Sequence, residues 1–356
     1  MPKHLHIRNM TSAHPITERL LDWYAEHARN LPWRAAPEPY ATWLSEVILQ
    51  QTRVDTGTAY WHRFLAAFPS VQNLAAAPPE AVMALWKGLG YYSRARNLHA
   101  AARQIMTSGR GAMPTDAEGW RELPGVGPYT AAAISSICFS EPVPVVDGNV
   151  QRVLSRLFDV VDPVDRKAGK SAIEAAAASL VHPTRPGDSN QAWMELGALV
   201  CKPKNPDCAS CPLRSECAAR IAGTHLQRPV KQPKKSAVEV QVVFDVRWRS
   251  RPGHDLEWWV ERRPERGIWG GLEAFPLTME ETQQTPDRLD LWGPVRHILT
   301  HRKMTAWFSV FEAEDGDVAG PGEWVAVADA DRTWPRLISK VLSELQSEVR
   351  FRAVKN

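Results

Sequence analysis

Four of the five cysteines in this chain of 356 residues lie within one short segment. They follow the spacing Cys-x6-Cys-x2-Cys-x5-Cys and are Cys201, Cys208, Cys211 and Cys217. Four thiolates this close together can bind a tetrahedral zinc ion or an iron–sulfur cluster. Zinc ribbons usually carry two Cys-x-x-Cys pairs, whereas this segment has one. With four protein ligands no coordination position remains for a substrate, so either metal would have a structural role.

A second group of residues that could do chemistry lies between Glu122 and Asn149. The string LPGVG predicts a tight hairpin between two helices, in which Gly125 and Gly127 allow positive φ and leave the backbone amides uncovered. Amides at a helix N-terminus can bind a phosphate. An apolar stretch then leads to Asp147 at the start of another helix, which would place a carboxylate close to that phosphate. An ordinary helical corner and an N-cap aspartate are the alternatives.

Glu46 is an acidic residue within the largely apolar helical string SEVILQQT. A glutamate in this setting either points to solvent or has its pKa raised by burial. The solvated position is the commoner one, because glutamate is seldom buried without a partner.

The composition bounds the class of protein without choosing a function. Apolar residues make up 44% of the chain, charged residues 23%, and the net charge is +3, so nucleic-acid binding would depend on local basic patches. The N-terminal stretch has no apolar signal segment, and no run reaches transmembrane length. We expect a monomeric cytoplasmic protein without a membrane partner, in which disulfides do not form.

Helical periodicity from residue 15 to residue 221 predicts an all-α domain of about ten helices that would position these groups. The clearest segments are 40–54, 59–68, 80–87, 93–108, 128–139 and 150–158. Residues 222–237 are basic and contain two prolines, which favours an extended linker. The length of the chain suggests a second domain after it.

From residue 238 to residue 348 the pattern changes to strands. Residues 238–249 alternate between apolar and polar side chains, which predicts a half-buried strand. Further strands are expected at 256–263, within 295–311 and at 324–327, followed by a helix over 334–345. The second domain is therefore predicted to be α+β.

The cysteine spacing, the hairpin with its trailing aspartate and the string SEVILQQT together resemble one family. It is the endonuclease III superfamily of helix-hairpin-helix base-excision DNA glycosylases, and within it the adenine DNA glycosylase (MutY) branch. The resemblance extends from about Ile16 to about Leu345. It implies a 4Fe-4S cluster on the four cysteines, with zinc as the alternative, and double-stranded DNA as the partner.

The resemblance also implies catalytic roles. Glu46 would give a proton to the departing base, ionised Asp147 would stabilise the cationic sugar, and Asn149 would orient them; two carboxylates with separated pKa values suit this reaction. Tyr129 stands where strand-cutting relatives carry a lysine, and a phenol cannot form a Schiff base. We therefore expect a monofunctional enzyme that removes adenine opposite 8-oxoguanine or guanine. A core tyrosine is the alternative for Tyr129.

Further binding roles follow from the same resemblance. The residues expected in an adenine pocket are Arg29, Leu31, Trp33, Arg34 and Gln191. Those expected to contact or enter the DNA are Gln51, Tyr91, Gly125 and Gly127. Basic residues on the cysteine loops, Lys202, Lys204 and Arg214, either contact phosphates or are simply solvated. For each of these side chains an exposed or packing role is the alternative.

The C-terminal domain resembles the MutT-like, Nudix-fold module of the same branch. Residues 269–276 match the start of a Nudix segment, but the acidic string that would hold magnesium does not follow, so pyrophosphate hydrolysis is disfavoured. Leu299, Thr300 and His301 stand where the family carries Phe-Ser-His for 8-oxoguanine recognition. Threonine keeps the hydroxyl group, whereas the aromatic ring is lost.

Two other functions compete with this interpretation. A bifunctional endonuclease III-like glycosylase and abasic-site lyase is disfavoured by Tyr129. A non-catalytic iron–sulfur DNA-binding protein would keep the cysteine loop and the hairpin without using Glu46.

Overall fold

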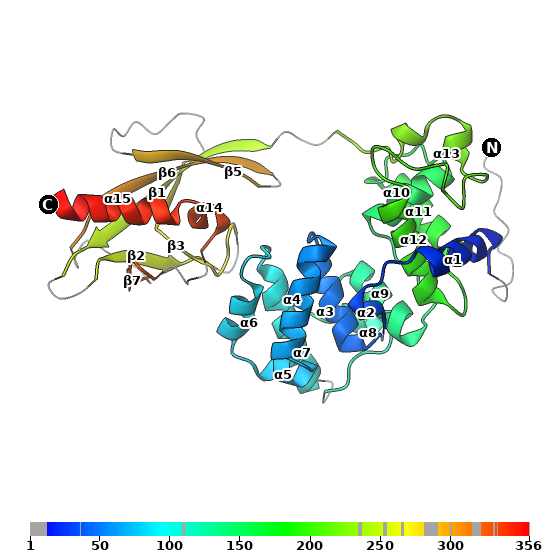
Figure 1. The fold of residues 1–356 in the computed structure, drawn as a ribbon, viewed down its shortest axis with the longest axis horizontal. Helices are drawn as coiled ribbons and strands as arrows, with labels where there is room; N and C mark the ends of the chain where they lie inside the picture. Colours follow the sequence, from blue (N-terminus) through cyan, green and yellow to red (C-terminus); the bar gives the residue numbers. More distant parts are fainter. Residues whose placement is uncertain are drawn as a thin grey trace. The chain divides into compact units, whose positions relative to one another are not determined.

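The computed structural model of the protein describes residues 13–35, 37–108, 111–233, 237–251, 255–264, 267–280, 291–299, 301–314, 322–329, 332 and 334–355. The chain forms two compact units, Met1–Pro233 and Lys234–Asn356 (Figure 1). Within the described residues, every helix is too short or too polar to cross a membrane.

All regular elements of the first unit's described residues are helices, as predicted. Its elements are α1 (Pro15–His27), α2 (Pro32–Ala35), α3 (Pro39–Leu49), α4 (Val54–Ala67), α5 (Val71–Ala76), α6 (Pro79–Trp86), α7 (Ser93–Ser108), α8 (Ala117–Arg121), α9 (Pro128–Phe139), α10 (Gly148–Leu157), α11 (Lys167–Leu180), α12 (Pro186–Leu199), α13 (Ala218–Ile221) and the 3-10 helix η1 (His225–Gln227). The pattern undercounts them because α2 and α13 have only four residues each.

Two apolar cores hold these helices together. One lies among α3 to α9 and includes the fully buried Trp43, Phe64 and Trp86; the other joins α1, α10, α11 and α12 and includes Leu20 and Leu154. Helix α9 packs against α3 on one side and α12 on the other. Burial of each such large side chain contributes about 1.5–3 kcal/mol. Helix α9 contributes Ala131 and Ile134 to the first core, and its Ala132 and Ala133 form a smaller cluster with Val145.

Helix α3 ends at Leu49, five residues earlier than the predicted helix 40–54. Gln51 has a φ of 59°, in the left-handed region, and the Thr52 amide donates to the Leu49 carbonyl at 3.1 Å. A residue other than glycine is rarely found with this φ. The prediction of one continuous helix was wrong, because α4 begins separately at Val54.

The hairpin between α8 and α9 forms as predicted, but its two glycines differ. Gly125 has a φ of 75°, and a Cβ there would lie 2.6 Å from Cβ of Asn97, so no other residue fits. Gly127 is the N-cap of α9 with φ −88° and ψ 176°, so the prediction of a positive φ there was wrong. Gly127 is exposed, and a Cβ there would have no neighbour within 4 Å, so the backbone at the start of α9 is open to approach from solvent.

The described part of the segment assigned to a linker packs on the first unit. The Val164 amide donates to the Val230 carbonyl at 3.0 Å, and Arg228 pairs with Asp159 at 2.8 Å. Residues 222–233 therefore belong to the first unit, and the two units divide after Pro233.

The second unit is α+β, as predicted. Its described strands are β1 (Val238–Arg249), β2 (Glu257–Arg262), β3 (Glu273–Ala274), β4 (Leu277–Glu280), β5 (Leu291–Ile298), β6 (Arg302–Glu312) and β7 (Gly322–Ala326). They follow the order β3-β2-β1-β6-β5, with β4 on β1 and β7 on β2. β1 and β6 run parallel in register from Val238↔Arg302 to Trp248↔Glu312.

The predicted helix 334–345 is instead two helices, α14 (Arg336–Ser339) and α15 (Leu342–Lys355). Figure 1 shows α15 along the inner face of the curved sheet. Its side chains Leu345 and Val349 join Phe244, Trp258 and Phe308 of the strands in one buried core. This core gives the second unit a stable apolar interior of its own.

Candidate active site

Three side chains from separate elements meet beside α9 in the first unit. Glu46 comes from the last two turns of α3, Tyr129 from the first turn of α9, and Asp147 is the N-cap of α10. Both Glu46 and Asp147 exert electrostatic influence on Tyr129, and Asp147 on Glu46. The structure thus brings together three of the four predicted catalytic residues, and Asn149 contacts Asp147 directly.

Glu46 is only partly exposed, and its carboxyl group is unusual. The pKa of Glu46 is raised to about 7, chiefly by burial and to a smaller extent by the charge of Asp147, while a hydrogen bond from Tyr129 and the charge of Arg34 oppose the increase. A carboxyl with this pKa holds a proton for part of the time at neutral pH. It can therefore act as a general acid.

The Tyr129 hydroxyl has one proton and two acceptors within reach. It lies 3.4 Å from Sδ of Met194 and it also hydrogen-bonds Glu46. A carboxylate is a much stronger acceptor than a thioether, so Tyr129 donates to Glu46 when that group is ionised. Burial, followed by the nearby carboxylates, raises the pKa of Tyr129 well above its usual value, which keeps the phenol protonated.

Asp147 is held by donors on both carboxylate oxygens. Oδ1 accepts from the Val150 amide at 2.7 Å, and Oδ2 accepts from Nδ2 of Asn149 at 2.8 Å. Burial raises the pKa of Asp147, and these hydrogen bonds together with the charge of Arg152 oppose the increase without cancelling it. The residue is an N-cap, and it also has an oriented carboxylate facing Glu46 and Tyr129.

Two arginines one turn apart on α10 connect this carboxylate to the cysteine segment. Arg152 donates to Oδ1 of Asn149 at 2.8 Å and to the carbonyl oxygen of Cys201 at 2.8 Å. Arg156, only 3% exposed, donates to the Lys202 carbonyl at 2.8 Å and to Sγ of Cys201 at 3.2 Å. The same helix thus orders Asp147 and anchors the first cysteine.

The four clustered cysteines lie close enough to influence one another. Burial raises the pKa of Cys211 to about 11, and the three other thiols of the segment add to this increase. Among the described residues, no three His, Cys, Asp or Glu side chains are arranged to hold one metal ion. The donor set itself, four soft sulfur ligands next to a buried arginine, fits an iron–sulfur cluster.

A charged network lies beside Glu46 and contains a residue that the sequence reading missed. Glu195 of α12 is 1% exposed and accepts from Nε of Arg29 at 2.8 Å, from Nη2 of Arg29 at 2.9 Å and from Nη2 of Arg34 at 3.0 Å. Burial opposes ionisation, but the hydrogen bonds from Arg29 and Arg34 prevail and lower the pKa of Glu195 to about 2. Two predicted pocket residues therefore converge on a permanently charged glutamate.

The other predicted pocket residues have different surroundings. Leu31 and Trp33 are nine-tenths buried in the apolar core, where the Trp33 ring meets Trp61 edge-on at 5.8 Å. Gln191 lies half-buried on α12, in the same helix as Glu195. None of these three residues hydrogen-bonds Glu195 in the described part of the chain.

Gln51 and Tyr91, predicted to enter DNA, share an uncommon backbone conformation. Gln51 is exposed, Tyr91 is 54% exposed, and their φ angles are 59° and 49°. Positive φ at residues other than glycine costs free energy and is concentrated at functional sites. Both side chains project from short connections, one after α3 and the other before α7.

The sequence and the fold of the chain are similar to those of known proteins. Residues 44–183 match the HhH-GPD superfamily base excision DNA repair protein family, and residues 252–344 match the NUDIX domain family. An adenine DNA glycosylase of Buchnera aphidicola subsp. Schizaphis graminum is 34% identical over 262 residues, which cover 73% of this chain and 74% of that protein. The chain belongs to the adenine DNA glycosylase family.

Other members of the family are longer. The human adenine DNA glycosylase is 47% identical over 211 residues, which are 56% of this chain and 38% of the human protein. The mouse enzyme is 45% identical over 228 residues, 61% of this chain and 44% of the mouse protein. The chain therefore spans less than half of these two relatives. A solved thermostable thymine-DNA glycosylase shares the helical fold, with a TM-score of 0.54 over 58% of this chain and 95% of that one, at 25% identity.

In the second unit of this adenine DNA glycosylase family member, Leu299 and His301 belong to the hairpin between β5 and β6. The Leu299 amide donates to the Arg302 carbonyl at 2.8 Å, and the Val238 amide donates to the His301 carbonyl at 3.1 Å. Leu299 packs partly on the core and His301 is exposed. Thr300 lies outside the described residues.

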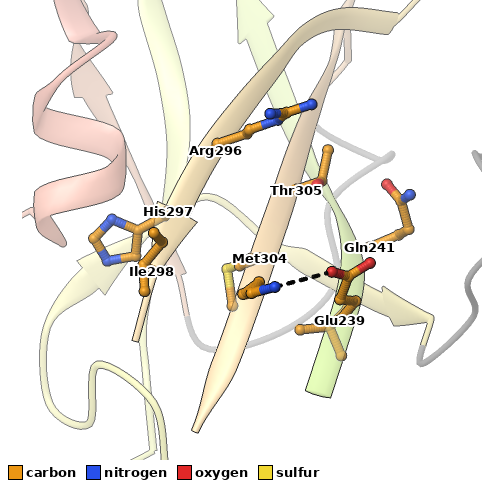
Figure 2. Close-up of a pocket in the computed structure, with 9 residues that line it drawn as sticks. Glu239, Gln241, Arg296, His297, Ile298, Met304 and Thr305 are labelled. Carbon is orange, nitrogen blue, oxygen red and sulfur yellow. Dashed lines mark hydrogen bonds and ion pairs between the residues drawn. The ribbon is translucent and has the colours of Figure 1, made fainter. Parts of the chain in front are cut away.

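A pocket of about 350 Å³ lies over the adjacent ends of β1, β5 and β6, beside this hairpin (Figure 2). Its one acidic lining residue, Glu239, pairs with Lys303 at 3.3 Å. Figure 2 shows His297 and Arg296 projecting from opposite sides of the same strand. Among the described residues that line this pocket Glu239 is the one carboxylate, so the pocket has no counterpart to the pair formed by Glu46 and Asp147.

Glu195 had a signal in the sequence that could have revealed it. It sits in the apolar helical string WMELGALV, the same kind of setting as Glu46 in SEVILQQT. Arg152 and Asn190 carried no comparable signal. Asn190 is 2% exposed and spans Ser136, Val143 and Val145 with hydrogen bonds of 2.9 to 3.1 Å, so it fixes the segment leading to Asp147.

Proposed function

We propose that the protein is a monofunctional adenine DNA glycosylase of base excision repair, acting on adenine opposite 8-oxoguanine or guanine in double-stranded DNA. One observation carries this proposal: Glu46, with its pKa raised to about 7 by burial, shares a site with the oriented carboxylate of Asp147. Family membership adds the adenine base and the repair setting.

The two carboxylates divide the work of hydrolysis. Protonated Glu46 donates to the adenine ring, so that the bond between the base nitrogen and the sugar C1′ breaks with the electron pair leaving on the base. Ionised Asp147 lies close to the cationic sugar that results, and Asn149 holds its second oxygen in place. A water molecule then adds to C1′ and gives its proton to a carboxylate, which yields free adenine and an abasic site.

Tyr129 supports the monofunctional assignment. Its pKa is raised well above the usual value by burial and by the nearby carboxylates, so it remains a neutral hydrogen-bond donor. It has no amine with which to form an imine with the opened sugar. Its role is to hydrogen-bond Glu46 and to favour the orientation in which that group faces the base.

The surroundings of the carboxylates suit an extruded purine. Arg29 and Arg34, fixed by Glu195, present charged and polar edges, while Leu31 and Trp33 give an apolar wall and Gln191 an amide that can pair with adenine. Gln51 and Tyr91 would fill the space left in the duplex, which compensates for the cost of extrusion. The uncovered amides of Gly125 and Gly127 would bind a backbone phosphate.

We propose that Cys201, Cys208, Cys211 and Cys217 hold a 4Fe-4S cluster with a structural role. The cluster would pin the loops that Arg152 and Arg156 join to α10, and Lys202, Lys204 and Arg214 on these loops would face DNA phosphates. The purified protein should be brown and contain iron and acid-labile sulfide in equal amounts. A colourless active protein that contains zinc would contradict the assignment.

Each of the two domains would have its own role in this function. Residues 15–233 would form the glycosylase domain, with the basic stretch 222–233 packed on it, and residues 238–348 would form the module that reads the opposing base. The exposed His301 and its neighbours Leu299 and Thr300 would contact 8-oxoguanine. The hairpin position of Leu299 and His301 supports this role, since such a tip can reach into a groove.

The deciding experiment is a single-turnover assay on duplexes that carry adenine opposite each base and 8-oxoguanine. Adenine release should be fastest opposite 8-oxoguanine, and the product should be cut by alkali but intact without it. Borohydride should trap no covalent complex. Release of another base, or an imine trapped by borohydride, would contradict the proposed function.

A further inference from the structure

Arg94 occupies a position that is unusual for a charged residue. It lies in the first turn of α7 and is 9% exposed. Within the described part of the chain its guanidinium makes no ion pair, and burial lowers its pKa to about 10. It is therefore still protonated at neutral pH. A buried cation with no carboxylate partner must be stabilised in another way.

The stabilisation comes from backbone carbonyl groups at the end of α3. Nη1 of Arg94 donates to the Val47 carbonyl at 2.8 Å and to the Ile48 carbonyl at 2.9 Å. The last carbonyls of a helix lack partners within the helix and carry its partial negative charge. Arg94 thus caps the helix that carries Glu46, immediately before the turn at Gln51.

The second nitrogen of the same group binds the connection that carries Tyr91, immediately before α7. Nη2 donates to the Gly90 carbonyl at 3.2 Å, and the guanidinium lies 5.0 Å from the centre of the Trp86 ring and 5.7 Å from that of Tyr91. One planar group therefore joins the residues before Gln51 to the residues before Tyr91. Both of those residues have positive φ, a conformation that persists only where neighbouring contacts impose it.

We propose that Arg94 is a positioning residue that fixes the Gln51 and Tyr91 connections as one rigid pair of wedges for extruding the adenine nucleotide. This inference rests on the proposed function, because it assigns these connections to extrusion. Arg94 itself would touch neither the base nor the sugar. Its contribution would be to extrusion, and the proton transfer by Glu46 would be affected much less.

Two variants and one control separate these contributions. Arg94→Lys keeps the charge but not the planar fork that reaches both sets of carbonyls; Arg94→Met keeps the length and apolar stem alone. Arg103→Met, at an exposed position of the same helix, is the matched control. Melting curves of all three establish that each variant is folded.

The experiment compares the release of adenine from two duplexes, one in which the adenine is paired and one in which it has no pairing partner. On a duplex with adenine opposite 8-oxoguanine, both Arg94 variants should lose at least about tenfold in single-turnover release, since extrusion costs a few kcal/mol. On a duplex with adenine opposite an abasic-site analogue, release should stay within about threefold of the unsubstituted protein, because little pairing energy remains to be overcome. A 2-aminopurine at the target position should brighten with the unsubstituted protein and with Arg103→Met, and much less with the Arg94 variants.

Equal losses on the two duplexes would overturn the proposal, and so would unchanged release and fluorescence in both variants. If the unsubstituted protein releases adenine from neither duplex, the proposed function fails. The fluorescence of the bound 2-aminopurine duplex would still decide the role of Arg94, because it reports extrusion without cleavage.

Discussion

Glu46 on α3 and Glu195 on α12 are both glutamates enclosed by protein in the same helical unit, yet their chemistry is opposite. Burial raises the pKa of Glu46 to about 7, whereas hydrogen bonds from two arginines overcome burial and lower the pKa of Glu195 to about 2. The environment lets Glu46 exchange a proton near neutral pH and holds Glu195 as an anion.

The difference lies in the partners. Glu195 accepts four hydrogen bonds from Arg29 and Arg34, including one from the Arg29 amide. Glu46 accepts from Tyr129, its one donor among the described residues, and the neighbouring Asp147 carries charge of the same sign. A carboxylate with several cationic donors keeps its charge in a buried site, while one beside another carboxylate takes up a proton. Changing the partners of either glutamate should therefore change its pKa in a direction that the structure predicts.

The largest expected effect comes from Glu46→Gln. The amide has the same shape but cannot donate an acidic proton, so adenine release in a single turnover should fall by about 100- to 10,000-fold. Binding to the duplex should be kept, because Gln51, Tyr91 and the hairpin are unchanged. Glu38→Gln, at the exposed N-cap of the same helix, should release adenine normally. Retained release in Glu46→Gln would remove this residue from the mechanism.

The second effect concerns stability. Glu195→Leu removes the acceptor of two arginines, one of which, Arg34, has only 15% of its side chain exposed. The loss should reduce the free energy of unfolding by about 2–4 kcal/mol, somewhat less than for a fully buried pair because Arg29 is partly solvated. Denaturant unfolding measures it.

A control variant completes this experiment. In the triple variant Arg29→Met, Arg34→Met, Glu195→Leu, apolar side chains replace the whole network, so much of the lost stability should return. If Glu195→Leu were as stable as the unsubstituted protein, the network would not be the structural counterpart of Glu46.

Much of this site could be predicted from the sequence, because its strongest signals are local. The cysteine spacing and the turn at Pro124-Gly125 each lie within a short string. Gly125 needs its positive φ in a four-residue turn, in which the Val126 amide donates to the Leu123 carbonyl at 3.1 Å. Local geometry of this kind can be predicted from residue type, although the same reasoning failed at Gly127, whose φ is −88°.

The features that were missed depend on residues far apart in the chain. The residue types of Gln50, Gln51 and Thr52 are all compatible with a helix, yet α3 ends at Leu49. The carbonyl groups of its last turn are bound by Arg94, which lies more than forty positions away in the sequence. The network around Glu195 joins α12 to residues more than 160 positions earlier. Helical periodicity indicates which face of a helix is buried. It does not indicate which charged residue from a distant part of the sequence will pack against that face.

The smallest effect is a shift in titration, and it has opposite signs for the two neighbours of Glu46. Because protonated Glu46 is the proposed acid, release should fall as the pH rises through about 7. Because the mechanism also needs ionised Asp147, whose pKa is raised by burial, release should fall again at acidic pH, where Asp147 takes up a proton. Arg34 lowers the pKa of Glu46 and Asp147 raises it. In carboxyl-labelled protein observed by NMR, Arg34→Met should therefore move the Glu46 titration to higher pH, and Asp147→Asn should move it to lower pH.

The same spectra follow Glu195, whose pKa should rise from about 2 in Arg34→Met, because burial is then opposed by Arg29 alone. Shifts of one sign in both variants would mean that a change in solvation, and not the two charges, sets the pKa of Glu46.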